Sequence, residues 1–198
     1  INNSGPIPAQ GERAIHITNV LAEEDTAEVI LINSGVIQGG ETDTGEALVH
    51  IDYVGDSSDT EIADDEPITA TVEITNSSTG SLLADSTSAA AILIDNVAAE
   101  SGGTATVDLD NAGTLRGRVD ASSDEIATFT NSGTWSVENG SSGGSALDLY
   151  AGVGASSTLT NTGTIEITGD ATFQLDTVEN TGGTIDLTAD TGVRGTFL

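Results

Sequence analysis

A seven-residue motif recurs along the chain and limits the folds open to it more than any other feature. In its clearest copy, Leu159–Ile165 (LTNTGTI), an apolar residue, Asn, Gly and a second apolar residue stand two positions apart. Four other copies keep this spacing: Ile1–Ile7, Leu31–Ile37, Leu109–Leu115 and Phe129–Trp135. Two imperfect copies delay the glycine or carry one extra residue: Ile74–Gly80 and Val178–Ile185. Such fixed spacing predicts one structural unit used many times.

The centre of the motif predicts a corner between two strands. Asn can hydrogen-bond the backbone two residues further on, and Gly takes positive φ without a steric penalty. The alternation of apolar and polar residues on both sides is typical of strands with one buried face. The expected corner asparagines are Asn3, Asn33, Asn76, Asn111, Asn131, Asn161 and Asn180. The expected corner glycines are Gly5, Gly35, Gly113, Gly133 and Gly163.

The resemblance of the corners to one another favours stacked coils. Unrelated Asn-x-Gly hairpins in an antiparallel sandwich are the alternative, but a sandwich does not require similar corners. Aromatic residues make up only 3% of the chain, which predicts a narrow interior filled by aliphatic side chains. We therefore expect one all-β solenoid domain over residues 1–198, with about eight or nine coils.

A strand that begins with alanine precedes most motifs and indicates the coil length. Ala14 precedes Asn33 by 19 residues, and Ala91 precedes Asn111 by 20. The interval from Ala47 to Asn76 is about ten residues longer. We assign the excess to an acidic insertion at 55–67, which we expect to project from the body as a surface loop.

Charge and composition exclude several classes of partner. The formal net charge is −28, with four Arg and no Lys, so nucleic acid and anionic membrane surfaces are unsuitable partners. No Cys is present to form a disulfide or a thiolate metal site. The sequence contains no apolar run near the 20 or so residues of a membrane-spanning helix, so we expect no membrane span in this segment.

The strings LTNTGTIEI, FTNSGTW, LINSGVI and LDNAGTL resemble the coils of autotransporter passenger domains and filamentous-haemagglutinin-like adhesins. This resemblance covers nearly the whole chain and implies a right-handed parallel β-helix. It also implies a bacterial cell-surface or secreted protein, with an extracellular location and host or matrix glycans as partners. It transfers no catalytic residue, because the shared motif is structural.

The acidic insertion is the candidate calcium site. Ca²⁺ takes six to eight oxygen ligands, and this segment carries several carboxylates without the ligand order of an EF-hand. The candidate ligands are Asp56, Asp59, Asp64, Asp65 and Glu66. A solvated acidic loop with diffuse counter-ions is the alternative. Ca²⁺ is the only cofactor that we expect, and only at this segment.

Two histidines form a second candidate. His16 and His50 follow Ala14 and Ala47 at similar places, so they are expected on one outer face of neighbouring coils. A metal site or an acid–base pair is one interpretation, and polar surface is the other.

Outward-facing carboxylates and arginines are weaker candidates. Two pairs of carboxylates, which suit glycoside hydrolysis at the right separation, are Asp148 with Glu166 and Asp108 with Asp110. Arg116 and Arg118 are expected on one face of a strand, where they would clamp an acidic sugar or pair with nearby carboxylates. Trp135 is expected to pack inward, and a sugar-stacking role would need it exposed.

Three functions fit these observations. The first is a non-enzymatic structural or adhesive surface protein that stacks end to end, since Ile1 opens inside a motif and residues 195–198 carry no polar cap. Its partners would be copies of itself or adjacent coils of the same protein. The second is a carbohydrate-active β-helix enzyme, and the third is a Ca²⁺-dependent surface-layer or filament subunit.

Overall fold

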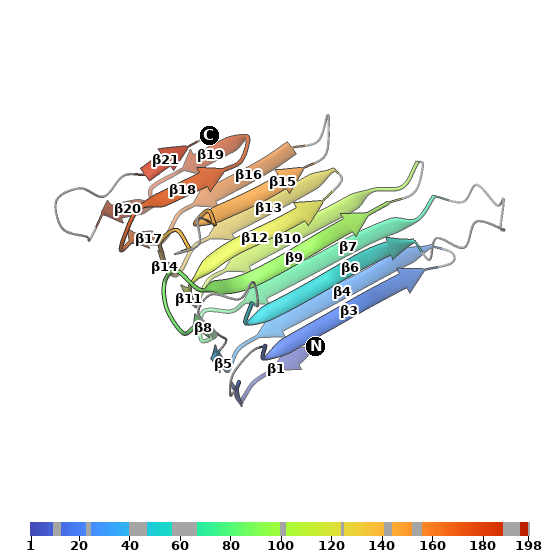
Figure 1. Cartoon of the computed structure of the whole chain (residues 1–198), viewed down its shortest axis with the longest axis horizontal. Coiled ribbons are helices and arrows are strands. Elements are labelled where there is room, and N and C mark those ends of the chain that lie inside the picture. The colour runs from blue at the N-terminus through green and yellow to red at the C-terminus, as the bar shows by residue number, and fades with distance from the viewer. Residues whose placement is uncertain are drawn as a thin grey trace.

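The computed structural model of the chain describes residues 1–9, 13–22, 25–39, 47–56, 67–99, 102–123, 125–140, 144–151, 156–187 and 195–197. All regular secondary structure in these ranges is β-strand. The 21 strands form three sheets of seven parallel strands each. Successive strands pass from sheet A to sheet B to sheet C and then begin again, so each circuit is one coil (Figure 1). The predicted parallel β-helix is confirmed.

Sheet A contains, in spatial order, β1 (Asn2–Asn3), β4 (Thr26–Asn33), β7 (Thr69–Asn76), β10 (Ala105–Asn111), β13 (Ile126–Asn131), β16 (Ser156–Asn161) and β19 (Thr177–Asn180). Sheet B contains β2 (Pro6–Pro8), β5 (Val36–Gly39), β8 (Ser81–Ala84), β11 (Thr114–Arg116), β14 (Thr134–Val137), β17 (Thr164–Ile167) and β20 (Thr184–Leu187). Sheet C contains β3 (Ile15–Ala22), β6 (Val49–Asp56), β9 (Ala90–Ala98), β12 (Arg118–Ser123), β15 (Leu147–Ala151), β18 (Ala171–Gln174) and β21 (Gly195–Phe197).

The described residues form seven coils, fewer than the eight or nine expected. The expectation assumed coils of little more than 20 residues. Successive corner asparagines are 30, 43, 35, 20, 30 and 19 residues apart, so four of the six intervals are much longer than that. The number of motif copies predicts the number of coils better. There are seven copies with the imperfect ones included, and each coil contains one corner asparagine.

Sheet A shows why the motif specifies this fold. Its strands from β4 to β16 pair in continuous register, with every corner Asn opposite the next. Inward positions form columns of buried side chains, and one such column holds Leu31, Ile74, Leu109, Phe129 and Leu159. A slip of one residue would turn each column out to solvent, so burial itself fixes the register.

Three buried aromatic residues pack together in the core of the later coils. The Trp135 ring lies edge-to-face with Phe129 and Phe173, at centroid distances of 4.9 and 5.8 Å. Its Nε1 donates to the carbonyl of Gly117 at 2.8 Å, so the indole is fully satisfied inside the protein. The expectation of inward packing is confirmed, and Trp135 is not exposed for sugar stacking.

Four of the five corner glycines, all except Gly5, are required for a different reason from the one that the sequence suggested. None of the five has positive φ; among the described residues, the glycines that do are Gly39, Gly102, Gly117 and Gly182. A Cβ on Gly133 would lie 2.1 Å from the carbonyl oxygen of Gly113 in the coil before. A Cβ on Gly163 would lie 2.2 Å from that of Gly133. Glycine is therefore needed for the close approach of stacked corners.

The acidic insertion begins later than expected. Strand β6 continues through Gly55 and Asp56, which pair with Leu21 and Ala22 of β3. Residues 57–66 lie outside the described part of the chain, so the expected projection of the loop stays a prediction.

Candidate functional site

The seven corner asparagines form one continuous hydrogen-bonded ladder. Each side-chain Nδ2 donates to the Oδ1 of the asparagine in the next coil, over distances of 2.7 to 2.9 Å from Asn3 to Asn180. From Asn33 to Asn161, each Nδ2 also donates to a backbone carbonyl of the next coil, at 3.0 to 3.2 Å. The five asparagines from Asn33 to Asn161 are buried. This position of the motif is therefore structural.

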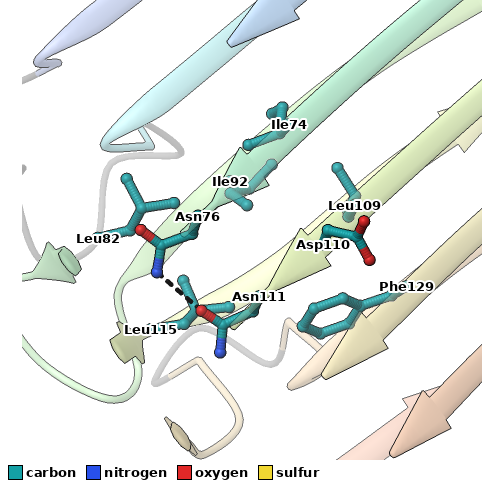
Figure 2. Close-up of a pocket in the computed structure, with 9 residues that line it drawn as sticks. All are labelled: Ile74, Asn76, Leu82, Ile92, Leu109, Asp110, Asn111, Leu115 and Phe129. Carbon is teal, nitrogen blue, oxygen red and sulfur yellow. Dashed lines mark hydrogen bonds between the residues drawn. The ribbon is translucent and has the colours of Figure 1, made fainter. Parts of the chain in front are cut away.

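A small internal cavity lies beside the ladder (Figure 2). Its volume is about 10 Å³, and it is lined by Ile74, Asn76, Leu82, Ile92, Leu109, Asp110, Asn111, Leu115 and Phe129. A cavity needs roughly 10–15 Å³ to hold even one water molecule. This cavity is therefore a minor packing defect and has no room for an organic ligand.

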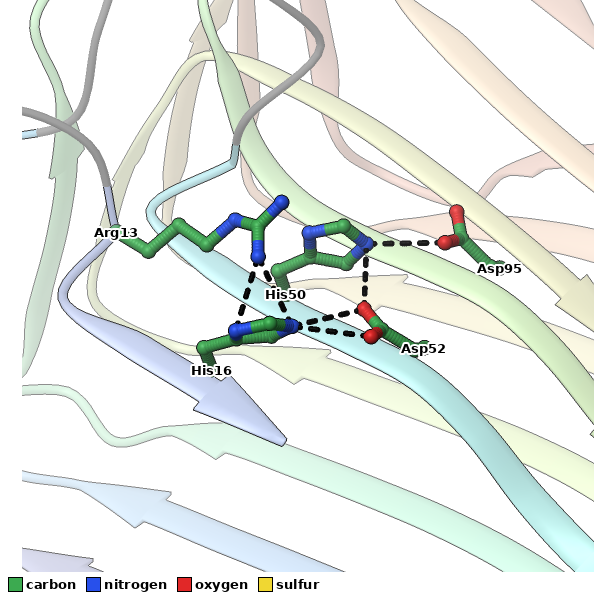
Figure 3. Close-up of polar contacts among 5 residues, drawn as sticks. All are labelled: Arg13, His16, His50, Asp52 and Asp95. Atoms are coloured by element: carbon green, nitrogen blue, oxygen red, sulfur yellow. Dashed lines mark hydrogen bonds and ion pairs between the residues drawn. The ribbon is translucent and has the colours of Figure 1, made fainter. Parts of the chain in front are cut away.

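The outer face of sheet C carries the most concentrated polar chemistry among the described residues. His16 of β3 and His50 of β6 are register partners, and their rings stack with centroids 5.2 Å apart (Figure 3). Asp52, two residues after His50 on the same face of the strand, extends toward both rings. We call His16, His50, Asp52 and Asp95 of β9 the His–Asp cluster.

Asp52 is the centre of the His–Asp cluster. Its Oδ1 lies 2.9 Å from Nε2 of His16 and 3.1 Å from Nε2 of His50. The hydrogen bond from His16 is the largest cause of a lowered pKa of Asp52, and the charges of the histidines and Arg13 act in the same direction. The carboxylate is therefore ionised at neutral pH.

Arg13 covers the His16 side of the cluster. Its Nη1 lies 2.9 Å from both ring nitrogens of His16 (Figure 3). An arginine can only donate, so it requires an unprotonated nitrogen on this ring. Nδ1 of His16 is that acceptor, because Nε2 donates to Asp52. The His16 ring therefore lies between the guanidinium of Arg13 and the carboxylate of Asp52.

His50 is buried although it points to the outer face. The residue is only 5% exposed, and its Nε2 faces Asp52 at 3.1 Å and Asp95 at 3.0 Å. Its Nδ1 is buried and has no hydrogen-bond partner. One ring therefore presents a single N–H to two carboxylates and leaves its second nitrogen unsatisfied.

The cluster was only half predicted by the sequence. The shared face of His16 and His50 is confirmed by their register. Asp52, Asp95 and Arg13 were missed as partners of the histidines. The spacing of His50 and Asp52 was the available signal, since residues two apart in a strand share a face.

A second polar group lies further along sheet C. Asp120 of β12 pairs in register with Asp148 of β15. Burial, together with the nearby charge of Asp148, raises the pKa of Asp120 to about 6. Burial also raises the pKa of Asp148. Glu166, the expected companion of Asp148, lies instead in sheet B and accepts a hydrogen bond from Ser136 at 2.6 Å.

The remaining sequence candidates do not build a site among the described residues. Asp108 and Asp110 are neighbours on the outer face of β10; burial is the main cause of a raised pKa of Asp110, and Asp108 adds to it. Arg116 and Arg118 belong to different sheets, because Gly117 turns the chain between them at a φ of 118°. Their Nε atoms donate to the backbone carbonyls of Ala84 and Ser88.

The expected calcium ligands lie mostly outside the described chain. Asp56 is the last residue of β6, and Asp59, Asp64, Asp65 and Glu66 fall in the undescribed segment. The calcium site therefore stays a prediction.

Comparisons with protein-family models, curated proteins and solved structures give no match to this chain. No helix long and apolar enough to cross a membrane occurs in the described ranges. The fold is a β-solenoid of repeated coils, and the resemblance to autotransporter and filamentous-haemagglutinin-like proteins stays an expectation.

Proposed function

We propose that this chain is a non-enzymatic structural or adhesive β-solenoid of a bacterial surface or secreted protein. The observation that carries the proposal is the asparagine ladder, which passes through all seven coils without a break. The residue that recurs most regularly in the sequence, the corner asparagine, forms hydrogen bonds that join one coil to the next. Selection for a long, uniform body is typical of a stalk or scaffold.

The ends of the solenoid support stacking as the mode of assembly. Strands β1, β2 and β3 stand at one edge of their sheets, and β19, β20 and β21 stand at the other. An edge strand presents backbone N–H and C=O groups that can pair with a further strand. The partners that fit are further coils of the same polypeptide or another copy of the chain.

The flanks support the same function. The net charge of −28 opposes side-by-side association of such bodies at low ionic strength. Divalent cations would weaken this repulsion. Acidic flanks are also compatible with exposure to the extracellular medium, which is the location that we propose.

Sedimentation velocity over a wide range of protein concentration tests this proposal. We expect elongated species whose length grows in steps of one chain, with Ca²⁺ and Mg²⁺ compared at equal ionic strength. A chain that stays monomeric at millimolar concentration in all these conditions would contradict assembly by stacking.

A carbohydrate-active enzyme is the second candidate, and one observation favours it. Asp120, with a pKa of about 6, lies half-buried beside Asp148 on the outer face of sheet C. A carboxylic acid whose pKa is raised toward neutral pH is suited to protonate a glycosidic oxygen. Release of reducing sugar from a panel of neutral and acidic polysaccharides, abolished by Asp120→Asn, would establish this alternative. The absence of any release would leave the structural function.

A further inference from the structure

We propose that His16, His50 and Asp52 form a binding site for a divalent transition-metal cation, with Zn²⁺ as the best-suited ion. The site would join β3 and β6, the sheet C strands of the first two coils, and it is independent of the stacking function proposed above. The three residues each offer one ligand atom, and these atoms lie within 4.8 Å of one another.

The spacing of the donor atoms suits a tetrahedral metal. With metal–ligand distances of 2.0–2.2 Å, neighbouring ligand atoms of a tetrahedral zinc site stand about 3.3 Å apart. The Oδ1 of Asp52 already lies 2.9 Å from Nε2 of His16 and 3.1 Å from Nε2 of His50. These two distances need to grow by only a few tenths of an ångström, and the third, between the two imidazole nitrogens, is at most 4.8 Å.

The protein without metal leaves His50 poorly satisfied. Its one N–H on Nε2 is shared between the carboxylates of Asp52 and Asp95. A cation in place of that proton would interact with both carboxylates at once, which a single N–H cannot do well. Asp95 would stand beside the metal, either as a fourth ligand or as the acceptor of a metal-bound water.

The ligand set selects the class of cation. Two imidazoles and a carboxylate suit Zn²⁺, Ni²⁺ or Co²⁺, whereas Ca²⁺ takes six to eight oxygen ligands. Nδ1 of His50 has no hydrogen-bond partner to orient the ring, and second-shell partners of this kind typically contribute 10–100-fold in metal affinity. We therefore expect weaker binding than in a fully built structural zinc site.

Two competing interactions must be separated from the proposed site. Arg13 lies against His16 and has to move away when a cation binds. The 32 acidic residues will also hold cations diffusely. Diffuse binding by carboxylates can be distinguished from binding at the proposed site, because the chain contains only two histidines and no cysteine. Any binding that depends on imidazole must arise from His16 or His50.

The direct test is nitrogen NMR of the histidine rings during titration with ZnCl₂. Only two ring systems contribute to such a spectrum, and both should shift together and saturate at one Zn²⁺ per chain. Calcium chloride at the same concentrations should leave them in place. Rings that do not respond to Zn²⁺, or a response of one ring alone, would overturn the proposal.

Calorimetric titration of variants supplies the second test. His16→Ala removes a partly exposed ligand, with a side chain 32% exposed, so its fold should be retained. We expect it to lower Zn²⁺ affinity at least about tenfold. The control is Asp148→Asn, which removes a carboxylate from the same sheet outside the cluster, and it should bind Zn²⁺ like the unaltered chain. Equal affinity in His16→Ala and the unaltered chain would also overturn the proposal.

Discussion

Breaking the asparagine ladder at its centre should destabilise the protein far more than breaking it at its end. Asn131 is fully buried, accepts from Asn111 at 2.8 Å and donates to Asn161 at 2.8 Å. Asn131→Ala would leave an N–H of Asn111 and the Oδ1 of Asn161 without these partners. Each unsatisfied buried group costs about 1–3 kcal/mol, so the expected loss of unfolding free energy is about 2–6 kcal/mol.

The matched control is Asn180→Ala at the last position of the ladder. Asn180 is exposed, so water can replace it as the partner of Asn161. We expect the free energy of unfolding to fall by less than about 1 kcal/mol, because a hydrogen bond to water replaces the one that Asn180 made. Urea-induced unfolding followed by circular dichroism at 218 nm or so gives both free energies from the transition midpoints. Equal costs for the two variants would refute the argument that burial makes the ladder important.

Three further predictions concern other parts of the fold. Because the folded pKa of Asp120 is about 6, above its ordinary value of 3.8, its ionisation lowers the stability of the fold progressively from about pH 3.8 to about pH 6, and the loss stays constant above that. Asp120→Asn should therefore stabilise the protein by roughly 3 kcal/mol at pH 8 and lose this advantage by pH 4, as measured by urea unfolding at each pH; a difference independent of pH would contradict it. Gly133→Ala should lower stability by more than about 1 kcal/mol, since its Cβ would meet the carbonyl of Gly113, whereas Gly5→Ala has nothing within 4 Å and serves as the control. Arg13→Gln should raise Zn²⁺ affinity in calorimetry by removing the competing cation, and an unchanged affinity would show that the guanidinium does not compete.

The coil architecture was predictable because the information for it is local. Within a few residues, the motif specifies an inward side chain, a polar corner and a second inward side chain, and stacking repeats this arrangement. The role of the corner glycines was misread for the opposite reason. Their requirement comes from a backbone oxygen of the preceding coil, 20 residues earlier at Gly133, and nothing in the local pattern reports that distance.

The His–Asp cluster shows the same limit. His16 meets Asp52 across 36 residues, and His50 meets Asp95 across 45. These separations depend on how many residues lie between successive strands of sheet C. The second and third coils are long, so the pairing of these residues could not be predicted from a regular spacing. Once the register is known, the outer face can be read directly, because residues opposite each other in adjacent parallel strands are neighbours.

The ladder also gives the molecule a direction. In all six links the amide nitrogen belongs to the earlier coil and the amide oxygen to the later one. The dipoles of the side-chain amides therefore point the same way along the stack, as peptide dipoles do in a helix. Within the described coils, the row begins with the oxygen of Asn3, which accepts from the N–H of Gly5, and ends with the nitrogen of Asn180, which donates to the carbonyl of Gly183. A second body can extend this row only head to tail, because two like ends would face oxygen with oxygen or nitrogen with nitrogen. Growth by stacking would thus produce a polar filament, with two chemically different tips.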